Sequence, residues 1–326
     1  MELRTLGKSG LQASVIGLGC WQLGGDFGTN GVNNAQQILA AADQHGISFW
    51  DTADVYGAGA SEKSIGDWQT THSATRTLVT KLGRDDSLFP NKYRKDTMRA
   101  SIEGSLARLQ VSSLDLVQLH CVPPAELQGD TIWQILEGFR DEGLIKHYGA
   151  SVETVEEGLM CLDKPGLTSL QIIFNLFRQD AINELLPKAQ AADVGIIARL
   201  PLASGLLSGK FAHNTQFSVQ DHCHYNKDGQ HFNVGETFSG LPFDKAVVLV
   251  NELKSIVPTN IPLAQFALRW LIDQPAVTTV IAGASSAQQV TQNAAAAALP
   301  SLSKTQHDEL SEFYQRRVRD HVRGSI

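Results

Sequence analysis

The sequence has few of the features that would place it outside ordinary globular proteins. Its 326 residues include only four cysteines, and no two of them have CxxC spacing. This scatter argues against a disulfide framework or a structural zinc site and favours a reducing cytosol, so we expect a cytoplasmic location. The N-terminus has no apolar core of a signal peptide, and no run approaches the ~20 apolar residues of a membrane helix.

Positive charge is also scarce. The chain has 27 Lys and Arg against 34 Asp and Glu, which gives a net charge of −7. This balance argues against nucleic acid or an anionic membrane as the main partner and leaves a small molecule as the expected one. An acidic protein can still hold an anionic cofactor, because the local charges of the site decide that. The sequence carries no sign of an oligomeric state.

A GxGxxG turn after the first strand is absent, but short apolar runs alternate with helical patterns. Runs of this kind are typical of strands buried on both faces. Strands are predicted at Val15–Leu18, Ser48–Asp51, Thr77–Lys81, Leu114–His120, His147–Ala150, Ser169–Phe174, Gly195–Arg199 and Thr278–Ile281. Helices are predicted at Asn34–His45, Ser61–Gln69, Lys95–Leu109, Thr131–Glu142, Val155–Leu162, Ile182–Ala192 and Ala287–Ala296.

Eight strands, nearly all followed by a helix, predict an α/β fold, a (β/α)₈ TIM barrel, formed as one domain by residues 1–326. A doubly wound sheet is the competing layout, and the strand count and the missing GxGxxG turn favour the barrel. Three additions are expected: an N-terminal β-hairpin at residues 3–14, a long loop after strand 7 at residues 203–242, and a C-terminal helix at Lys304–Arg319. Two further helices, Phe243–Ile256 and Pro262–Asp273, precede the last strand.

Four polar side chains are expected at the same rim of this barrel. Three predicted strands end in Asp51, Lys81 and His120, and the loop after the second strand supplies Tyr56. Catalytic groups of barrels lie at the carboxyl ends of the strands. An acid, a base, an imidazole and a phenol therefore converge on one site.

These residues and their surroundings resemble the aldo-keto reductase family. The string FWDTADVYG, followed by SEKSIG, is a specific signature of that family. The resemblance also includes LARLxxxxLDLVQLH, LPLASGLLSGK and the closing GASSxxQVxxN, and it covers nearly the whole chain in the right order. It extends to the branch that includes bacterial aldo/keto reductases and potassium-channel β-subunit-like proteins.

The resemblance implies an enzyme, an oxidoreductase that transfers hydride between NADP(H) and a carbonyl or alcohol substrate. Asp51, Tyr56, Lys81 and His120 would form its catalytic tetrad. A free tyrosine has a pKa near ~10, and a neighbouring lysine ammonium stabilises its phenolate and eases proton exchange. Tyr56 would then be the general acid, Asp51 would hold Lys81 charged, and His120 would orient the carbonyl oxygen.

The resemblance also places the cofactor. Gly19, Trp21, Asp51, Ser151, Gln171 and Arg199 would surround the nicotinamide. The segment with Pro201, Leu202, Ser204 and Gly205 would follow the pyrophosphate through its backbone N–H groups, with Lys210 adding charge. The helix start after Gly283 would take the 2′-phosphate through Ser285 and Gln289, and Gln292 and Asn293 would contact adenine.

Three departures from the family's pattern affect these expectations. Val152 stands where many relatives have Asn, and Arg199 stands where many have an aromatic ring against the nicotinamide. A guanidinium is planar and also stacks, so we expect replacement of the ring. The adenine end lacks the Lys and Arg pair that grips a 2′-phosphate in many relatives, and has Gly283 and Gln289 instead. NADP(H) is predicted, and NAD(H) stays open.

Two alternatives to a carbonyl reductase remain. One is an NAD-linked sugar or alcohol dehydrogenase of the same fold, and the other is a cofactor-binding sensor subunit of low turnover. The substrate wall is expected to include Trp21, Tyr56, His120, Phe27 and Trp50. No metal is expected: the His-rich run Asp221–His224, with His213 and His231 nearby, matches no zinc spacing and is interpreted as a polar lid.

Overall fold

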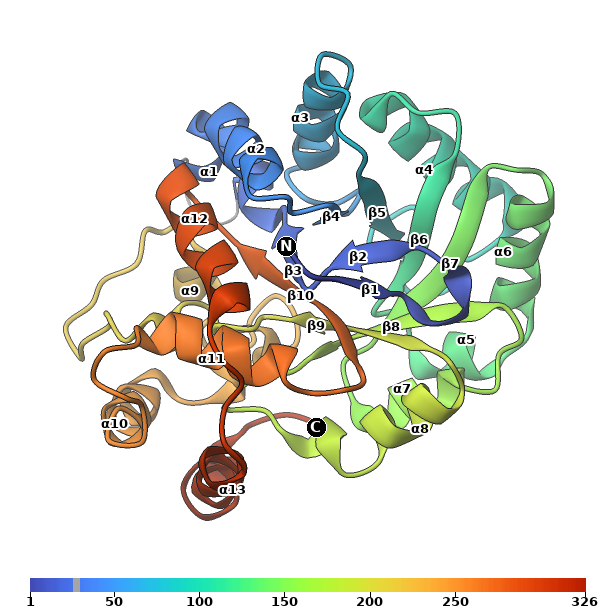
Figure 1. Ribbon diagram of the computed structural model, residues 1–326. Coiled ribbons are helices and arrows are strands. Elements are labelled where there is room, and N and C mark those ends of the chain that lie inside the picture. Colours follow the sequence, from blue (N-terminus) through green and yellow to red (C-terminus); the bar gives the residue numbers. More distant parts are fainter. Residues whose placement is uncertain (26–29) are drawn as a thin grey trace.

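Eight parallel strands close into a barrel at the centre of the molecule, as predicted (Figure 1). The structure is a computed structural model that describes residues 1–25 and 30–326. Around the barrel the strands follow the order β10-β3-β4-β5-β6-β7-β8-β9. Their bounds are β3 Ile16–Gly19, β4 Phe49–Asp51, β5 Thr77–Leu82, β6 Leu114–His120, β7 Ile145–Ser151, β8 Leu167–Ile173, β9 Gly195–Arg199 and β10 Val277–Gly283.

Helices form a ring outside the strands (Figure 1). The longer ones are α2 Ala35–Gln44, α3 Ala60–Gln69, α4 Lys95–Leu109, α6 Thr131–Asp141, α7 Val155–Cys161, α8 Leu185–Ala191, α10 Phe243–Leu253, α11 Leu263–Ile272, α12 Ala287–Ala295 and α13 Lys304–Phe313. Three short helices, α1 Asn30–Asn33, α5 Pro124–Gln128 and α9 His222–Tyr225, lie in the connections. The described part of the chain contains no helix with the length and hydropathy to cross a membrane.

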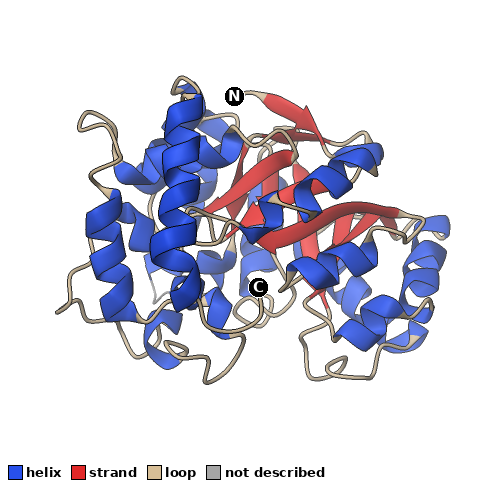
Figure 2. Ribbon diagram, turned by 90° about the horizontal axis from the view of Figure 1, so that it is seen from below, coloured by secondary structure: helices blue, strands red, loops and turns tan. Residues whose placement is uncertain are grey.

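The predicted N-terminal hairpin closes one end of the barrel. Strands β1 (Leu3–Thr5) and β2 (Gln12–Ser14) pair antiparallel, and Figure 2 shows the N-terminal strand at one edge of the molecule. Leu6 and Ala13 of the hairpin are fully buried and pack with Phe49, Leu116 and Ile197 from inside the barrel. This apolar plug leaves the carboxyl ends of the strands as the open end of the barrel.

Several element boundaries differ from the expectation. Strands β7 and β8 each begin two residues before the predicted start, at Ile145 and Leu167. Ile145 is buried and pairs with Leu114, although the exposed Lys146 follows it. The long loop at residues 203–242 is present as predicted, but part of it is packed: it contains α9, and its His222, Thr237 and Phe238 are fully buried. Polar residues there satisfy one another, so composition alone was misleading.

Candidate active site

A cavity of about 810 Å³ opens at the carboxyl ends of the strands. Strand-end residues form its floor, and the loop at 203–242 supplies one wall. Its lining includes three of the four tetrad residues and several predicted cofactor residues, namely Asp51, Tyr56, His120, Gly19, Trp21, Gln171, Arg199, Pro201 and Gly283. The structure therefore brings together residues that are far apart in the sequence, at the rim where they were expected.

Lys81 is the centre of a buried hydrogen-bonded chain. Its ammonium nitrogen lies 2.5 Å from Asp51 Oδ1 and donates to the Tyr56 hydroxyl at 3.2 Å. A third bond, of 2.8 Å, goes to the carbonyl oxygen of Thr52. The side chains of Lys81 and Asp51 are 1% and 2% exposed, so water does not compete for these bonds. The three donor positions of the ammonium are therefore all used, which fixes the side chain.

The electrostatics of this chain favour a charged lysine beside a protonated phenol. Burial alone would lower the pKa of Lys81, but Asp51 and Tyr56 raise it, and the net shift is upward. Burial raises the pKa of Tyr56, and the Lys81 charge opposes that rise without cancelling it. Tyr56 therefore carries its proton at neutral pH, with a cation next to its oxygen.

His120 faces the same phenol from the end of β6. The rings of Tyr56 and His120 meet edge to face with centroids 5.9 Å apart. Burial lowers the pKa of His120 well below its usual range, and the charges of Arg84, Lys81 and Arg199 lower it further. The imidazole is neutral at physiological pH, and its buried Nδ1 has no hydrogen-bond partner within the described residues. The ring itself forms part of the cavity lining.

The residues predicted around the nicotinamide lie together, with contacts of their own. Gln171 donates to Asp51 Oδ2 at 2.8 Å, which adds a support for the carboxylate that the sequence did not predict. Ser151 Oγ lies 3.5 Å from Gln171 Oε1, so these two side chains are neighbours. Trp21 stacks on Tyr56 with centroids 5.7 Å apart. Gly19, at the end of β3, completes this part of the lining.

The residues predicted for the pyrophosphate lie in the turn that follows β9. Leu202 lies in the turn after Pro201, and Ser204 has a positive φ of 55°. The Ser204 hydroxyl donates to the Glu236 carbonyl oxygen at 3.1 Å and accepts from the Phe238 N–H at 3.2 Å, so it anchors the loop. Gly205 caps a short 3-10 helix, and Lys210 is exposed.

At the adenine end, the start of α12 holds its own side chains. Gln289 Oε1 accepts the Ser285 N–H at 2.7 Å, and the Ser286 hydroxyl caps the helix. Gln292 is exposed, whereas Asn293 is buried and donates to the Gly283 carbonyl oxygen at 3.3 Å. Ser285, Gln289 and Gln292 are therefore accessible to a ligand, and Asn293 supports the turn.

One expected member of the substrate wall is misplaced. Trp50 is fully buried between the barrel and its helices, and its indole N–H donates to the Ile47 carbonyl oxygen at 2.8 Å. Successive side chains of a strand point to opposite faces, so Trp50 points away from the side that carries Asp51. Phe27, also expected there, lies outside the described residues.

The cavity lining also contains charged residues that were not predicted from the sequence. They are Arg84 after β5, Glu153 after β7 and Glu236 in the loop wall, and the neutral Cys121 lies beside His120. Arg84 and Glu153 follow strand ends by two residues, which is a signal that the barrel pattern could have supplied. Nothing in the local sequence marks Glu236, because its partners come from distant strands.

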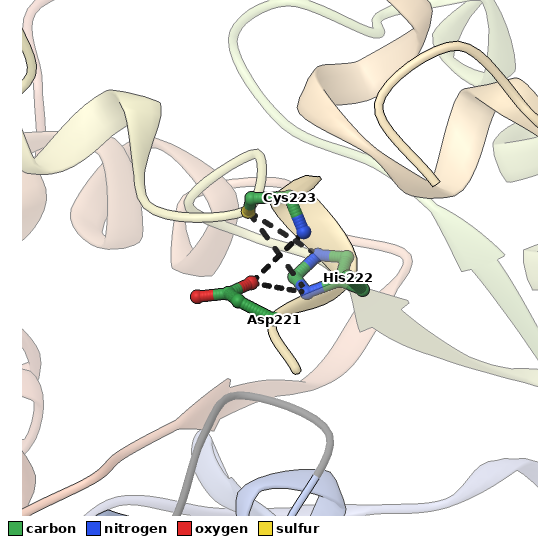
Figure 3. Close-up of side chains that lie close together, drawn as sticks. All are labelled: Asp221, His222 and Cys223. Atoms are coloured by element: carbon green, nitrogen blue, oxygen red, sulfur yellow. Dashed lines mark hydrogen bonds and ion pairs between the residues drawn. The ribbon is translucent and has the colours of Figure 1, made fainter. Parts of the chain in front are cut away.

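The His-rich run forms a compact cluster, shown in Figure 3. Asp221 Oδ1 lies 3.2 Å from His222 Nδ1 and accepts the Cys223 N–H at 2.8 Å, which caps α9. The Cys223 sulfur lies 3.9 Å and 3.7 Å from the two ring nitrogens of His222. One possible ligand atom from each of Asp221, His222 and Cys223 lies within 4.8 Å of the others. His222 also packs against Trp21, with centroids 5.0 Å apart.

Comparison with known proteins extends these observations. The Aldo/keto reductase family matches residues 15–315. An uncharacterized oxidoreductase of Bacillus subtilis, YqkF, is 30% identical over 301 residues, which is 91% of each chain. A probable voltage-gated potassium channel subunit beta of Oryza sativa is 29% identical over 315 residues, 90% of each chain.

Solved structures show the same fold. The aldo-keto reductase AKR11C1 from Bacillus halodurans, in its holo form, superposes with a TM-score of 0.77 at 25% identity over 96% of each chain. An aldo/keto reductase from Klebsiella pneumoniae, solved with NADP and acetate, gives 0.71 at 24% identity over 99% of each chain. With a family match over nearly the whole length and an eight-stranded barrel of this design, the chain belongs to the aldo/keto reductase family of oxidoreductases.

Proposed function

We propose that this protein reduces aldehydes or ketones with NADPH, and oxidises the corresponding alcohols in reverse, with Tyr56 as the general acid. The observation that carries the proposal is the buried Asp51–Lys81–Tyr56 chain, which ends at a cavity shared with His120. A carbonyl that gains hydride on carbon must gain a proton on oxygen, and Tyr56 holds that proton at the edge of the cavity. Positioned proton donors of this kind contribute roughly 10²–10⁴ in rate.

The neighbours of Tyr56 prepare it to release and recover the proton. The Lys81 ammonium, 3.2 Å from the phenol oxygen, stabilises the phenolate that remains after proton donation. Asp51 keeps that ammonium charged and oriented, and Gln171 steadies Asp51 by its 2.8 Å bond. Neutral His120, whose ring lines the cavity beside Tyr56, would hydrogen-bond the substrate oxygen and so fix the direction from which Tyr56 is approached.

The residues present fit a nicotinamide dinucleotide. The cavity of about 810 Å³ has Gly19, Gln171, Arg199 and His120 in one lining, which suits a nicotinamide with a substrate beside it. Gly19, Trp21, Gln171 and Arg199 would surround the ring, which supplies hydride when bound. Accessible Ser285 and Gln289 at the start of α12 would receive the 2′-phosphate, with Lys210 as an added charge. This arrangement supports NADP(H), with NAD(H) as the alternative.

The potassium-channel relative favours a second candidate, a cofactor-binding subunit of low turnover. The two candidates share the cofactor site and differ in hydride transfer. Stopped-flow mixing of the NADPH complex with a panel of aldehydes and ketones separates them. We expect loss of the reduced-nicotinamide absorbance with at least one carbonyl, and no transfer to any of them would reject the reductase. A parallel fluorescence titration with NADPH and NADH tests the cofactor.

A further inference from the structure

Four charged side chains line the cavity next to His120, and the tetrad does not use them. Arg84 follows β5, Glu153 follows β7, Arg199 ends β9, and Glu236 comes from the loop wall. Arg84 and Arg199 line the same cavity as His120. A pair of guanidinium groups beside this imidazole is an apt receptor for a carboxylate on the substrate.

Glu236 already occupies the space between those two guanidinium groups. Arg84 donates through both terminal nitrogens, to Glu236 Oε2 at 3.3 Å and to Glu236 Oε1. Arg199 approaches the same Oε1 atom at 3.6 Å from the other side. Arg84 is also 3.1 Å from Glu153 Oε1, and Asn233 holds the second oxygen of Glu153 at 2.7 Å. The two cations are thus matched by two anions.

Burial makes this pairing strong. The side chains of Glu236 and Arg199 are 5% and 9% exposed, so solvent screens them little. Burial raises the pKa of Glu236, but the charges of Arg84 and Arg199 outweigh it and lower the pKa to about 2. Glu236 is therefore ionised throughout the neutral range. Because it stays charged, it stays paired with Arg84 and Arg199, and protonation does not free these arginines for another anion.

No arginine of the described lining is left without an acidic partner. Asp51 is paired with Lys81, and Glu157 accepts the backbone N–H groups of Glu153 and Thr154 at 2.7 and 3.4 Å. Among the described lining residues, each arginine has an acidic partner. A carboxylate on the substrate would therefore have to displace Glu236 or face it without a free donor, and both cost free energy.

We propose that Glu236 is a specificity-determining residue, a built-in counter-anion that directs this cavity to uncharged carbonyl substrates and excludes those with a carboxylate near the carbonyl. The inference rests on the proposed carbonyl reduction. Under this proposal, Glu236 determines whether the cavity accepts a negatively charged group of the substrate beside His120. A merely structural role, anchoring the loop at 203–242, would affect charged and uncharged substrates alike.

The test uses substrates that differ only in charge: 3- and 4-formylbenzoate against the corresponding formylbenzamides. The measured quantity is the ratio of kcat/KM for the carboxylate to kcat/KM for its amide. Wild-type enzyme should prefer the amides. Glu236→Gln, which keeps the shape but frees Arg84 and Arg199, should raise the ratio roughly tenfold to a hundredfold, the effect of one charge-assisted hydrogen bond.

Two further variants make the test directional. Arg84→Gln leaves Glu236 and Glu153 in excess and should lower the same ratio below the wild-type value. Glu157→Gln is the matched control, because Glu157 lines the cavity but bonds to backbone N–H groups. It should move the ratio by less than a third of the Glu236→Gln effect. If Glu236→Gln fails to fold, the direction of the Arg84→Gln shift still decides.

The outcomes separate this inference from the proposed function. Carbonyl reduction itself is overturned only if no carbonyl of the stopped-flow panel, the formylbenzamides included, is reduced. If the panel is reduced but the formylbenzamides are not, the expected preference for the amides fails and the role of Glu236 is overturned. Reduction of both, with a ratio unchanged in Glu236→Gln and not lowered in Arg84→Gln, would overturn the role of Glu236 alone. A wild-type preference for the carboxylates would also overturn it, because the guanidinium groups would then be open to substrate.

Discussion

The tetrad and the start of α12 hold their functional side chains in different ways. At the tetrad, Lys81 and Asp51 are almost completely buried, and Lys81 donates hydrogen bonds to both Asp51 and Tyr56. At the start of α12, Ser285 is half-buried and Gln289 is exposed, and their one mutual bond joins a side chain to the backbone. The first set is locked by charge in a dry environment, whereas the second is open to solvent.

This difference predicts which measured quantity each end controls. In a buried site the protonation state of one group depends on its neighbours, so a substitution changes the chemistry. At an exposed site water replaces a lost bond, so a substitution changes affinity by a modest factor. We therefore expect tetrad variants to lose turnover and adenine-end variants to lose or gain cofactor binding.

The largest effect is expected for Tyr56→Phe. The phenyl ring keeps the stacking on Trp21, 5.7 Å between centroids, but lacks the proton donor. Turnover in carbonyl reduction should fall by ~10²–10⁴ while NADPH affinity stays near wild type. Steady-state kinetics and a fluorescence titration of NADPH give the two values. Retention of more than about a tenth of wild-type turnover would lie outside that range and reject Tyr56 as the acid.

Lys81→Met should be the next most damaging change. It removes the cation beside the phenol and leaves Asp51 buried without its partner, so we expect a loss of turnover on the order of 10². Burial already raises the pKa of Tyr56, and the Lys81 charge is the strongest influence that opposes this rise. Without Lys81 the pKa of Tyr56 should therefore rise further. The loss of reduction at high pH should then move to still higher pH.

Lys81→Arg is the matched control for that experiment, because it keeps a cation near the phenol while changing its shape. Its pH–rate profile should stay closer to wild type than that of Lys81→Met. A Lys81→Met enzyme with an unchanged profile would show that the lysine does not tune Tyr56.

Three residues of the tetrad could be placed from the sequence because they lie at the ends of strands that were recognisable on their own. Asp51, Lys81 and His120 needed only the rule that the carboxyl ends of barrel strands share one rim, whereas Tyr56 comes from a loop and was singled out by the family resemblance. Trp50 was wrongly expected in the substrate wall. It precedes Asp51 directly in β4, and successive side chains of a strand point to opposite faces. Glu236 was missed because its role depends on Arg84 and Arg199, which are distant in sequence and met only in the folded chain.

A smaller effect is expected at the adenine end. If Ser285, Gln289 and Lys210 hold the 2′-phosphate, NADPH should bind roughly tenfold to a few hundredfold more tightly than NADH, the lower range of hydrogen bonds to a charged group. Added salt should shrink this preference, because exposed charges are screened over ~8–10 Å. Replacing Ser285 by Arg should strengthen NADPH binding and leave NADH binding nearly unchanged. Equal or tighter binding of NADH by the wild type would favour the NAD-linked dehydrogenase.

The smallest effect is expected for a change of pH near neutrality, which should leave the charge of His120 unchanged. Burial and the charges of Arg84, Lys81 and Arg199 all lower its pKa well below the usual 6.5. A lowered pKa means that the neutral form persists as the pH falls, so the ring should stay uncharged from about pH 8 to about pH 6. Imidazole NMR resonances of selectively labelled protein test this, with the His120 signal identified by its loss in His120→Gln. Its shift should stay constant while exposed histidines titrate, and a midpoint inside that range would show that the site is wetter or less cationic than the structure describes.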